Sequence, residues 1–197
     1  ITGHPSQIRD AEYMRAHADP NWRFEVFDAT SAYSLMTLPG PKAREILQTL
    51  SGNDLSATNL PFGGAAEIDL AHARVWVIRR SFLGELGFEI LVSTEFAAGV
   101  YEAILAAGEP LGLRHMGMFA LNACRIEKGF RHFGHDITCE DHVLEAGLGF
   151  AVARDKADFI GRDAVLRKRE AGLARRMVQF RLTDPAPLLY HNEPILR

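Results

Sequence analysis

Apolar and polar positions alternate along the first fifty residues in a way that predicts two helices and two strands. Apolar residues recur at loose helical spacing over 7–17, whereas charged and apolar residues alternate over 23–28, as in a half-buried strand. A second strand is expected at 34–38. A helix is expected at 42–50, because Pro41 has its φ angle preset for the first turn of a helix.

The middle of the chain has the pattern of neighbouring strands followed by a helix. Strands are expected at 66–70 and 74–80, around an Ala-His-Ala turn, and a further strand at 88–92. A helix at 96–107 is then ended by Gly108. This succession is typical of an α+β fold with a ferredoxin-like antiparallel sheet and helices on one face.

The last third of the chain has a weaker pattern. The elements expected there are helices at 116–128 and 161–171, strands at 148–152 and 176–182, and the start of another strand at 194–197. The chain opens on Ile-Thr-Gly-His without an initiating Met. We therefore expect a piece cut from a longer protein at both ends.

Composition and charge narrow the classes of protein that this chain can represent. Apolar residues make up 47% and charged residues 24%, as in ordinary folded domains, and the formal net charge is −3 without a basic stripe for nucleic acid. No apolar run reaches the roughly 18 residues that a membrane span needs. Cys124 and Cys139 have no metal-type spacing. We expect a cytoplasmic protein that binds neither nucleic acid nor membrane.

The segment 81–90 is the first candidate for a binding site. Gly84 and Gly87 bracket the carboxylate of Glu85, and a strand then begins with a second carboxylate at Glu89. A carboxylate at the start of a buried strand is costly unless it is paired, and it can accept two adjacent N–H groups from a planar heterocycle. The alternative is a surface hairpin with two exposed glutamates. The glycine spacing lacks the third glycine of a dinucleotide fingerprint.

The segment 125–136 is the second candidate. Arg125 and Lys128 lie where cations favour a helix end, and Gly129 is a plausible C-cap. The residues that could hold a metal ion here are His132, His135, Asp136 and His142. Their spacing matches no zinc pattern, so we expect ordinary loop hydrogen bonds and no metal site. No serine, histidine and aspartate order indicates a nucleophilic triad.

Both segments resemble the aminomethyltransferase family, that of the glycine-cleavage T-protein. The closer resemblance is to the folate-binding C-terminal region of dimethylglycine and sarcosine dehydrogenases. The family pattern S-Y-V-G-E-L-G-W-E-L is matched by 81–90, and L-R-I-E-K-G-Y-R-H-W-G-H-D-I by 124–137. Further patterns of the family are matched at 38–47, 59–63, 144–150 and 159–165.

This resemblance implies the aminomethyltransferase fold, with a ferredoxin-like folate-binding domain and partial flanking domains. Residues 1–30 would end a truncated first folate-binding subdomain, and 31–110 would form the ferredoxin-like subdomain. Residues 111–173 would be a helical return segment of the first subdomain, and 174–197 the truncated start of a C-terminal β-barrel.

The resemblance also implies tetrahydrofolate as cofactor and assigns residues to it. The position of Glu89 accepts hydrogen bonds from the pterin, and Phe82 replaces a tyrosine that packs beside it. Arg125 is the third candidate cofactor-binding residue. Leu121 stands where T-proteins have a folate-contacting arginine, which favours the dehydrogenase branch. The catalytic aspartate of the family lies upstream of this chain, so we expect no catalytic residue here.

The function implied is that of a folate-binding fragment of a dimethylglycine or sarcosine dehydrogenase-like protein. Such a protein transfers a one-carbon unit from an N-methyl amine, or another aminomethyl donor, to tetrahydrofolate. An FAD-dependent oxidoreductase domain would lie upstream or in a separate subunit, so FAD belongs to the full-length protein and not to this fragment. The alternatives are a non-catalytic folate-binding scaffold and a stand-alone aminomethyltransferase.

Overall fold

The computed structural model of the chain describes residues 1–189, 193 and 194. The chain divides into two compact units, Ile1–Met118 and Phe119–Arg197, which are described separately. The division into four parts that the resemblance implies stays a prediction.

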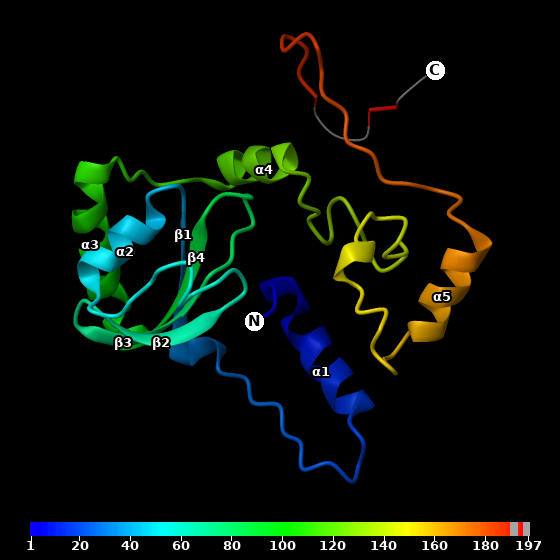
Figure 1. The fold of residues 1–197 in the computed structure, drawn as a ribbon, viewed down its shortest axis with the longest axis horizontal. Helices are drawn as coiled ribbons and strands as arrows, with labels where there is room; N and C mark the ends of the chain where they lie inside the picture. The colour runs from blue at the N-terminus through cyan, green and yellow to red at the C-terminus, as the bar shows by residue number, and fades with distance from the viewer. Residues whose placement is uncertain (190–192, 195–197) are drawn as a thin grey trace. The chain divides into compact units, whose positions relative to one another are not determined.

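The first unit is built on an antiparallel sheet of four strands (Figure 1). These are β1 (Tyr33–Pro39), β2 (Ala65–Leu70), β3 (Ala73–Ile78) and β4 (Gly87–Ser93), in the order β1-β4-β3-β2. All three neighbouring pairs are antiparallel. The strand predicted at 74–80 ends at Ile78, so the two arginines that follow lie in the loop to β4.

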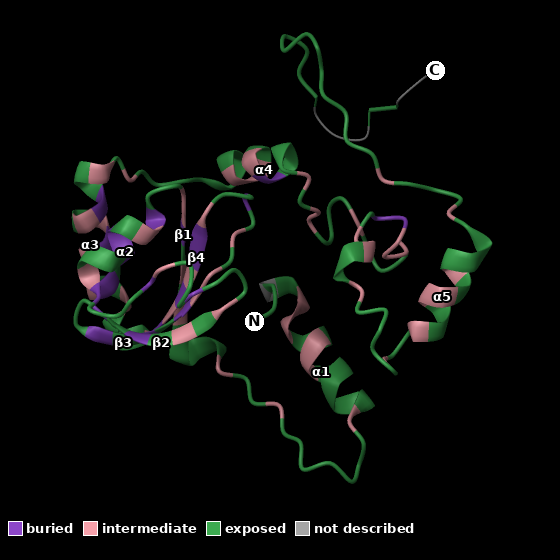
Figure 2. Cartoon of the chain, viewed as in Figure 1, coloured by how far each residue is buried: buried purple, intermediate pink, exposed green. Residues whose placement is uncertain are grey.

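Helices cover one face of this sheet and form the core with it. α2 (Ala43–Leu50) and α3 (Ala97–Gly108) pack against each other and against β4, on the same side of the sheet in Figure 1. Buried side chains from α2, α3 and the four strands join in one apolar cluster, and Figure 2 shows buried residues gathered there. The α+β fold, with helices on one face of an antiparallel sheet, is thereby confirmed.

The second unit consists mainly of loops. It contains most of α4 (Met118–Glu127), which ends because Gly129 adopts a φ of 72°. The amide of Phe130 donates to the carbonyl of Arg125 and that of Gly129 to Ile126, both at 2.9 Å, which is a Schellman cap. The predicted C-cap glycine is therefore confirmed. The other α-helix of this unit is α5 (Arg162–Ala171).

The remaining helical segments of the described residues are five short 3-10 turns and the longer helix α1. They are η1 (His4–Ser6), α1 (Gln7–His17), η2 (Thr30–Ala32), η3 (Thr94–Phe96), η4 (Glu109–Leu111) and η5 (Gly149–Ala151). The helix predicted at 7–17 is confirmed as α1, although none of its residues is buried.

Three predicted strands are wrong. Residues 23–28 and 176–182 form no strand, and 148–152 contain the 3-10 turn η5. An alternating pattern reports which side chains are sheltered, but a strand also needs a partner for its backbone N–H and C=O groups. In η5 the turn follows Gly147, whose φ of 70° turns the chain just before it. The strand predicted at 194–197 falls mostly outside the described residues.

Candidate functional site

Glu89 lies on the face of the sheet that the helices leave uncovered. Side chains alternate along β4, so Phe88 and Ile90 point into the helix-covered core, whereas Glu89 points to the other face. Its neighbours across the sheet are Thr37 on β1 and Ile78 on β3. Only 18% of the Glu89 side chain is exposed. A carboxylate is thus sheltered at the middle of an otherwise open sheet face.

The two carboxylate oxygens of Glu89 have different surroundings. Oε1 lies 3.6 Å from Nε of Arg80, whose side chain is half exposed. Oε2 is buried and accepts no hydrogen bond from the described residues. A buried polar atom without a partner costs about 1–3 kcal/mol, and more when it carries charge. The site therefore contains an acceptor that a ligand N–H group could satisfy.

Gly87 allows the loop before β4 to cross this face. A Cβ atom at Gly87 would lie 2.9 Å from Cβ of Ser81 and 3.0 Å from the carbonyl oxygen of Arg80, closer than Cβ atoms normally approach, so the loop would have to shift. Gly87 and Glu89 point to the same face of β4. The loop therefore passes over the open face two residues before Glu89, and this brings Arg80 within reach of its carboxylate.

Phe82 lies in the same loop, both ends of which form backbone hydrogen bonds to neighbouring segments. Arg79 exchanges backbone hydrogen bonds of 2.9 Å with Gly63 and Gly64, and the carbonyl of Leu86 accepts from Gly40 at 2.7 Å. Leu83 is buried, whereas Phe82 is 37% exposed. The loop thus has a fixed path while the ring of Phe82 remains partly accessible. Its role beside a cofactor stays a prediction.

Apolar side chains surround Glu89 on the open face. The registers place Leu91 beside Leu35 on one neighbouring strand and beside Trp76 on the other. Leu35 and Trp76 are each almost half exposed. Such a surface suits the flat, apolar faces of a ring system, while the single carboxylate would orient its polar edge.

Arg125 lies in the second unit and is almost fully buried. Its guanidinium donates from Nε to Oδ1 of Asn122 at 2.7 Å, and from Nη1 to the carbonyl of Phe130 at 3.0 Å. It also pairs with both carboxylate oxygens of Asp136. These contacts join the end of α4 to the loop that follows. The cofactor-binding role predicted for Arg125 stays a prediction.

Asp136 and His132 have shifted pKa values as a result of this cluster. Burial raises the pKa of Asp136, but hydrogen bonds from the amide of His132 and from Arg125, with the charge of Arg125, lower it further than burial raises it. The net pKa lies below the ordinary value. The pKa of His132 is lowered by burial, then by His135 and Arg125, and Asp136 opposes this only in part. His132 therefore loses its proton more readily than an ordinary histidine.

The histidines of this segment do not gather into a metal site in the described part of the chain. The ring centroids of His132 and His135 lie 4.2 Å apart. However, no group of three His, Cys, Asp or Glu side chains among the described residues is arranged to hold a metal ion. His142 accepts a backbone hydrogen bond from Leu144 at 3.2 Å.

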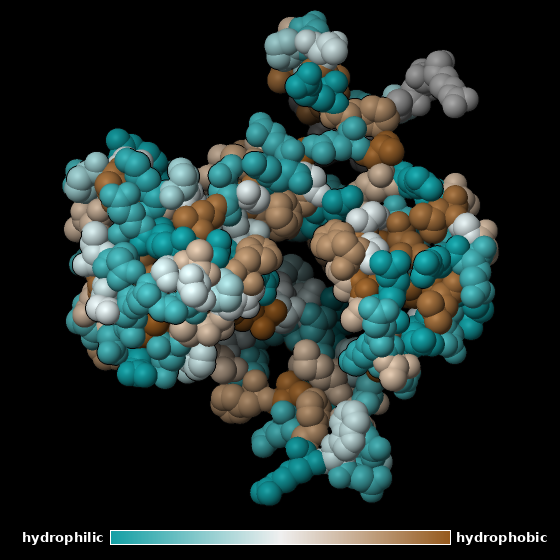
Figure 3. Space-filling view, viewed as in Figure 1, coloured by the Kyte–Doolittle hydropathy of each residue, from teal (hydrophilic) through white to brown (hydrophobic). Residues whose placement is uncertain are grey.

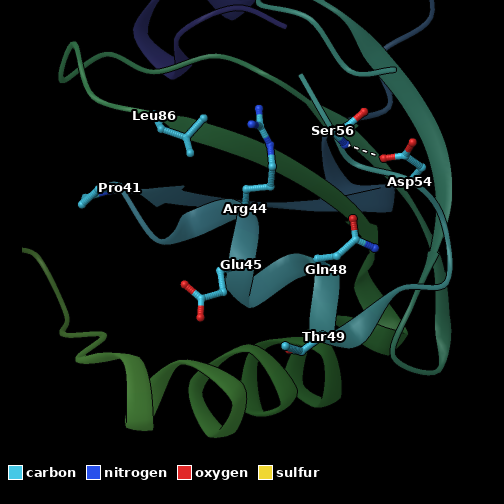
Figure 4. Close-up of a pocket in the computed structure, with 8 residues that line it drawn as sticks. All are labelled: Pro41, Arg44, Glu45, Gln48, Thr49, Asp54, Ser56 and Leu86. Atoms are coloured by element: carbon cyan, nitrogen blue, oxygen red, sulfur yellow. Dashed lines mark hydrogen bonds between the residues drawn. The ribbon is translucent and has the colours of Figure 1, made fainter. Parts of the chain in front are cut away.

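A groove of about 600 Å³ runs along α2 in the first unit (Figure 4). Arg44 projects into it near Leu86 and Ser56. The Nε and Nη2 atoms of Arg44 are buried and form no hydrogen bond to another described residue, and Cζ of Arg44 lies 5.9 Å from the centre of the Phe88 ring. Asp54 and Glu45 also line the groove. Sequence reasoning singled out neither this groove nor Arg44.

Sequence reasoning identified Glu89 but missed its neighbour Arg80. The pair Arg79-Arg80 was visible only as a short run of charge, which is most often a solvated surface. The structure separates the two: Arg79 Nη1 donates to the carbonyl of Leu60 at 3.2 Å, whereas Arg80 faces Glu89. The turn that decides this could not be deduced from the spacing.

Comparison with known proteins assigns residues 1–156 to the family described as GCVT N-terminal domain. The chain is 39% identical over 196 residues to 4-methylaminobutanoate oxidase (formaldehyde-forming) of Paenarthrobacter nicotinovorans, covering 99% of this chain and 24% of the relative. It is 38% identical over 174 residues to an aminomethyltransferase of Halothermothrix orenii, covering 88% and 48%.

A third relative is the mitochondrial dimethylglycine dehydrogenase of Homo sapiens, 36% identical over 180 residues, covering 90% of this chain and 21% of the relative. The chain therefore spans between about a fifth and a half of these relatives. Among solved structures, the heterotetrameric sarcosine oxidase from Corynebacterium sp. U-96 matches 47% of this chain at 22% identity, with a TM-score of 0.41. None of the helices among the described residues has the length and apolarity to cross a membrane.

Proposed function

This chain belongs to the GCVT N-terminal domain family, and we propose that it binds tetrahydrofolate through Glu89 as part of a longer protein. That protein would resemble dimethylglycine and sarcosine dehydrogenases and transfer a one-carbon unit from an N-methyl amine to the folate. Relatives named for oxidation of methylated amines and for aminomethyl transfer support this assignment.

The observation that carries the proposal is the buried, unpartnered Oε2 of Glu89. The edge of a pterin presents an amino group next to a ring N–H, and a carboxylate can accept both side by side. Binding would satisfy the orphaned acceptor, and the ring faces would rest on apolar neighbours such as Leu91 and Trp76. The residues present therefore fit the cofactor.

The bound folate would supply the nitrogen that receives the one-carbon unit. The part of this chain is to bind and orient the ring: Glu89 selects the polar edge, and the fixed loop around Phe82 limits where the ring can lie. Correct placement of the reacting nitrogen removes much of the entropic cost of the transfer. We propose no catalytic residue within this chain.

The proposal includes further parts of the intact protein. Large apolar side chains such as Phe119, Phe150 and Phe27 are more than four-fifths exposed. We propose that an FAD-dependent oxidoreductase domain or subunit is among these parts, in line with the relatives named as an oxidase and a dehydrogenase. Cytoplasmic location is also part of the proposal, and the free thiols of Cys124 and Cys139 agree with a reducing compartment.

Titration of tetrahydrofolate into the longer protein that contains this chain tests the proposal. Glu89→Gln should weaken binding by about 10- to 100-fold, because charge-assisted hydrogen bonds contribute about 1.5–3 kcal/mol. Glu67→Gln is the matched control, since Glu67 lies on the same sheet face two strands away and pairs with Arg74. Absence of binding by the wild type, or equal binding by Glu89→Gln, would refute the proposal.

Activity separates the two alternatives. A stand-alone aminomethyltransferase would transfer its one-carbon unit without an amine oxidase partner, and a scaffold would bind folate but turn over no donor. Release of the one-carbon unit from an N-methyl amine, together with FAD reduction and folate binding at Glu89, would support the proposed function over both.

A further inference from the structure

We infer that Arg80 makes the Glu89 site specific for a ring edge that presents two donors followed by an acceptor. The inference rests on the proposed function, and it identifies the 4-oxo group of the pterin as the feature that Arg80 recognises.

The geometry around Glu89 places a donor beside an acceptor. Nε of Arg80 lies 3.6 Å from Oε1 of Glu89, whereas Oε2 is buried and accepts no hydrogen bond from the described residues. In the proposed orientation the ring N–H meets Oε1 and the amino group meets Oε2, so the edge atom beyond the ring N–H lies toward Arg80. That edge atom must be an acceptor, because every polar atom of a guanidinium is a donor.

Arg80 has N–H groups available for this contact. A separation of 3.6 Å is too long for a hydrogen bond, so Arg80 and Glu89 attract each other without using those donors. No hydrogen bond of the Arg80 side chain to another described residue is formed, and 52% of the side chain is exposed. A long ion pair whose arginine is half exposed adds little stability, so Arg80 can turn to a ligand at low cost.

The backbone holds Arg80 at this position. The carbonyl oxygen of Arg80 lies so near Gly87 that a Cβ there would approach it to 3.0 Å, and the amide of Arg80 donates to the carbonyl of Ile78 at 3.0 Å. Ile78 is itself the β3 neighbour of Glu89. Arg80 and Glu89 are therefore positioned by the same short stretch of sheet, which favours recognition of one rigid ring edge.

The chemistry of pterins separates the two classes of ligand that such a site would meet. The edge of a 4-oxo pterin presents an amino group, a ring N–H and a carbonyl, that is, donor, donor, acceptor. Exchange of the 4-oxo for a 4-amino group replaces the acceptor by a donor and the ring N–H by a bare nitrogen. Arg80 would stabilise the first edge and not the second.

The experiment compares two ligands that differ only at this group, tetrahydrofolate and tetrahydroaminopterin. Their Kd values are measured by calorimetry with the longer protein, at a pH above the pKa of the 4-amino ring, so that both rings are neutral. The variants are Arg80→Met and, as control, Arg74→Met. Arg74 lies on the same sheet face but pairs with Glu67 at 3.3 Å and Asp69 at 3.5 Å.

Arg80→Met should raise the Kd of tetrahydrofolate by about 10-fold, as expected for a lost charge-assisted hydrogen bond. The Kd of the 4-amino ligand should stay the same or fall. The ratio of the two Kd values should not change in Arg74→Met. If Arg80→Met changes both Kd values equally, the inference is overturned while the proposed function stands. If the Kd values of both ligands are the same in Glu89→Gln as in the wild type, the proposed function itself fails.

Discussion

The ion pair of Arg125 with Asp136 gives the sharpest prediction for stability. Among the described residues, Asp136→Ala would leave the guanidinium of Arg125, which is 3% exposed, with only Asn122 and the Phe130 carbonyl as acceptors. Loss of one partner of a buried pair costs about 3–5 kcal/mol. We expect about 3 kcal/mol, the lower end of this range, because the Asp136 side chain is 32% exposed and part of the lost pairing is replaced by water.

Hydrogen exchange of the α4 amides and the 129–137 loop is the assay. Both tryptophans, Trp22 and Trp76, lie in the first unit, so their fluorescence reports on that unit alone and serves as an internal control. Asp136→Ala should lower protection in the second unit by about 100-fold, the equivalent of about 3 kcal/mol, and leave the tryptophan transition unchanged.

The effect of Asp136→Ala should depend on pH in a defined direction. The folded pKa of Asp136 lies below its unfolded value, which is about 3.9. The stabilisation is therefore complete above the unfolded pKa and is lost as the pH falls through the folded one. Wild type and variant should converge in acid. Asp158→Ala, an exposed carboxylate in the same unit, is the control. Equal protection in the two variants at neutral pH would refute the reasoning.

Two further substitutions probe the first unit, each followed by tryptophan fluorescence in urea. Arg44→Met removes two buried donors without partners at the loss of a cation–π contact with Phe88; we expect unchanged stability or a gain of about 1–2 kcal/mol. A loss above about 2 kcal/mol would mean that the guanidinium has a partner. Gly87→Ala should cost about 1–3 kcal/mol and weaken folate binding, since the loop at Arg80 must move. Gly52→Ala, where no atom lies within 4 Å of the new Cβ, should do neither, and equal behaviour of the two glycine variants would contradict this account.

Local pattern was sufficient for the elements that carry their own signals. The helix at α2 follows from Pro41 and an apolar face, β4 from its short, mainly apolar run, and the end of α4 from Gly129. Each depends on residues within a few positions of one another, so neighbouring side chains and backbone angles decide it. The strands expected at 23–28 and 176–182 failed because strand pairing depends on a distant partner.

The candidate site also has features that the sequence predicts and features that only the tertiary structure decides. The sequence by itself determined that Glu89 lies near the start of a strand beside two glycines, and its resemblance to a folate-binding family made that carboxylate the leading candidate. Only the tertiary structure decided that Arg80 faces Glu89 while Arg79 turns to Leu60, and that Oε2 of Glu89 is buried with no hydrogen-bond partner in the described part of the chain. The charges of the residues and their spacing can be read from the sequence. The burial of a side chain and its hydrogen-bond or ion-pair partners depend on contacts between strands and loops that form only on folding.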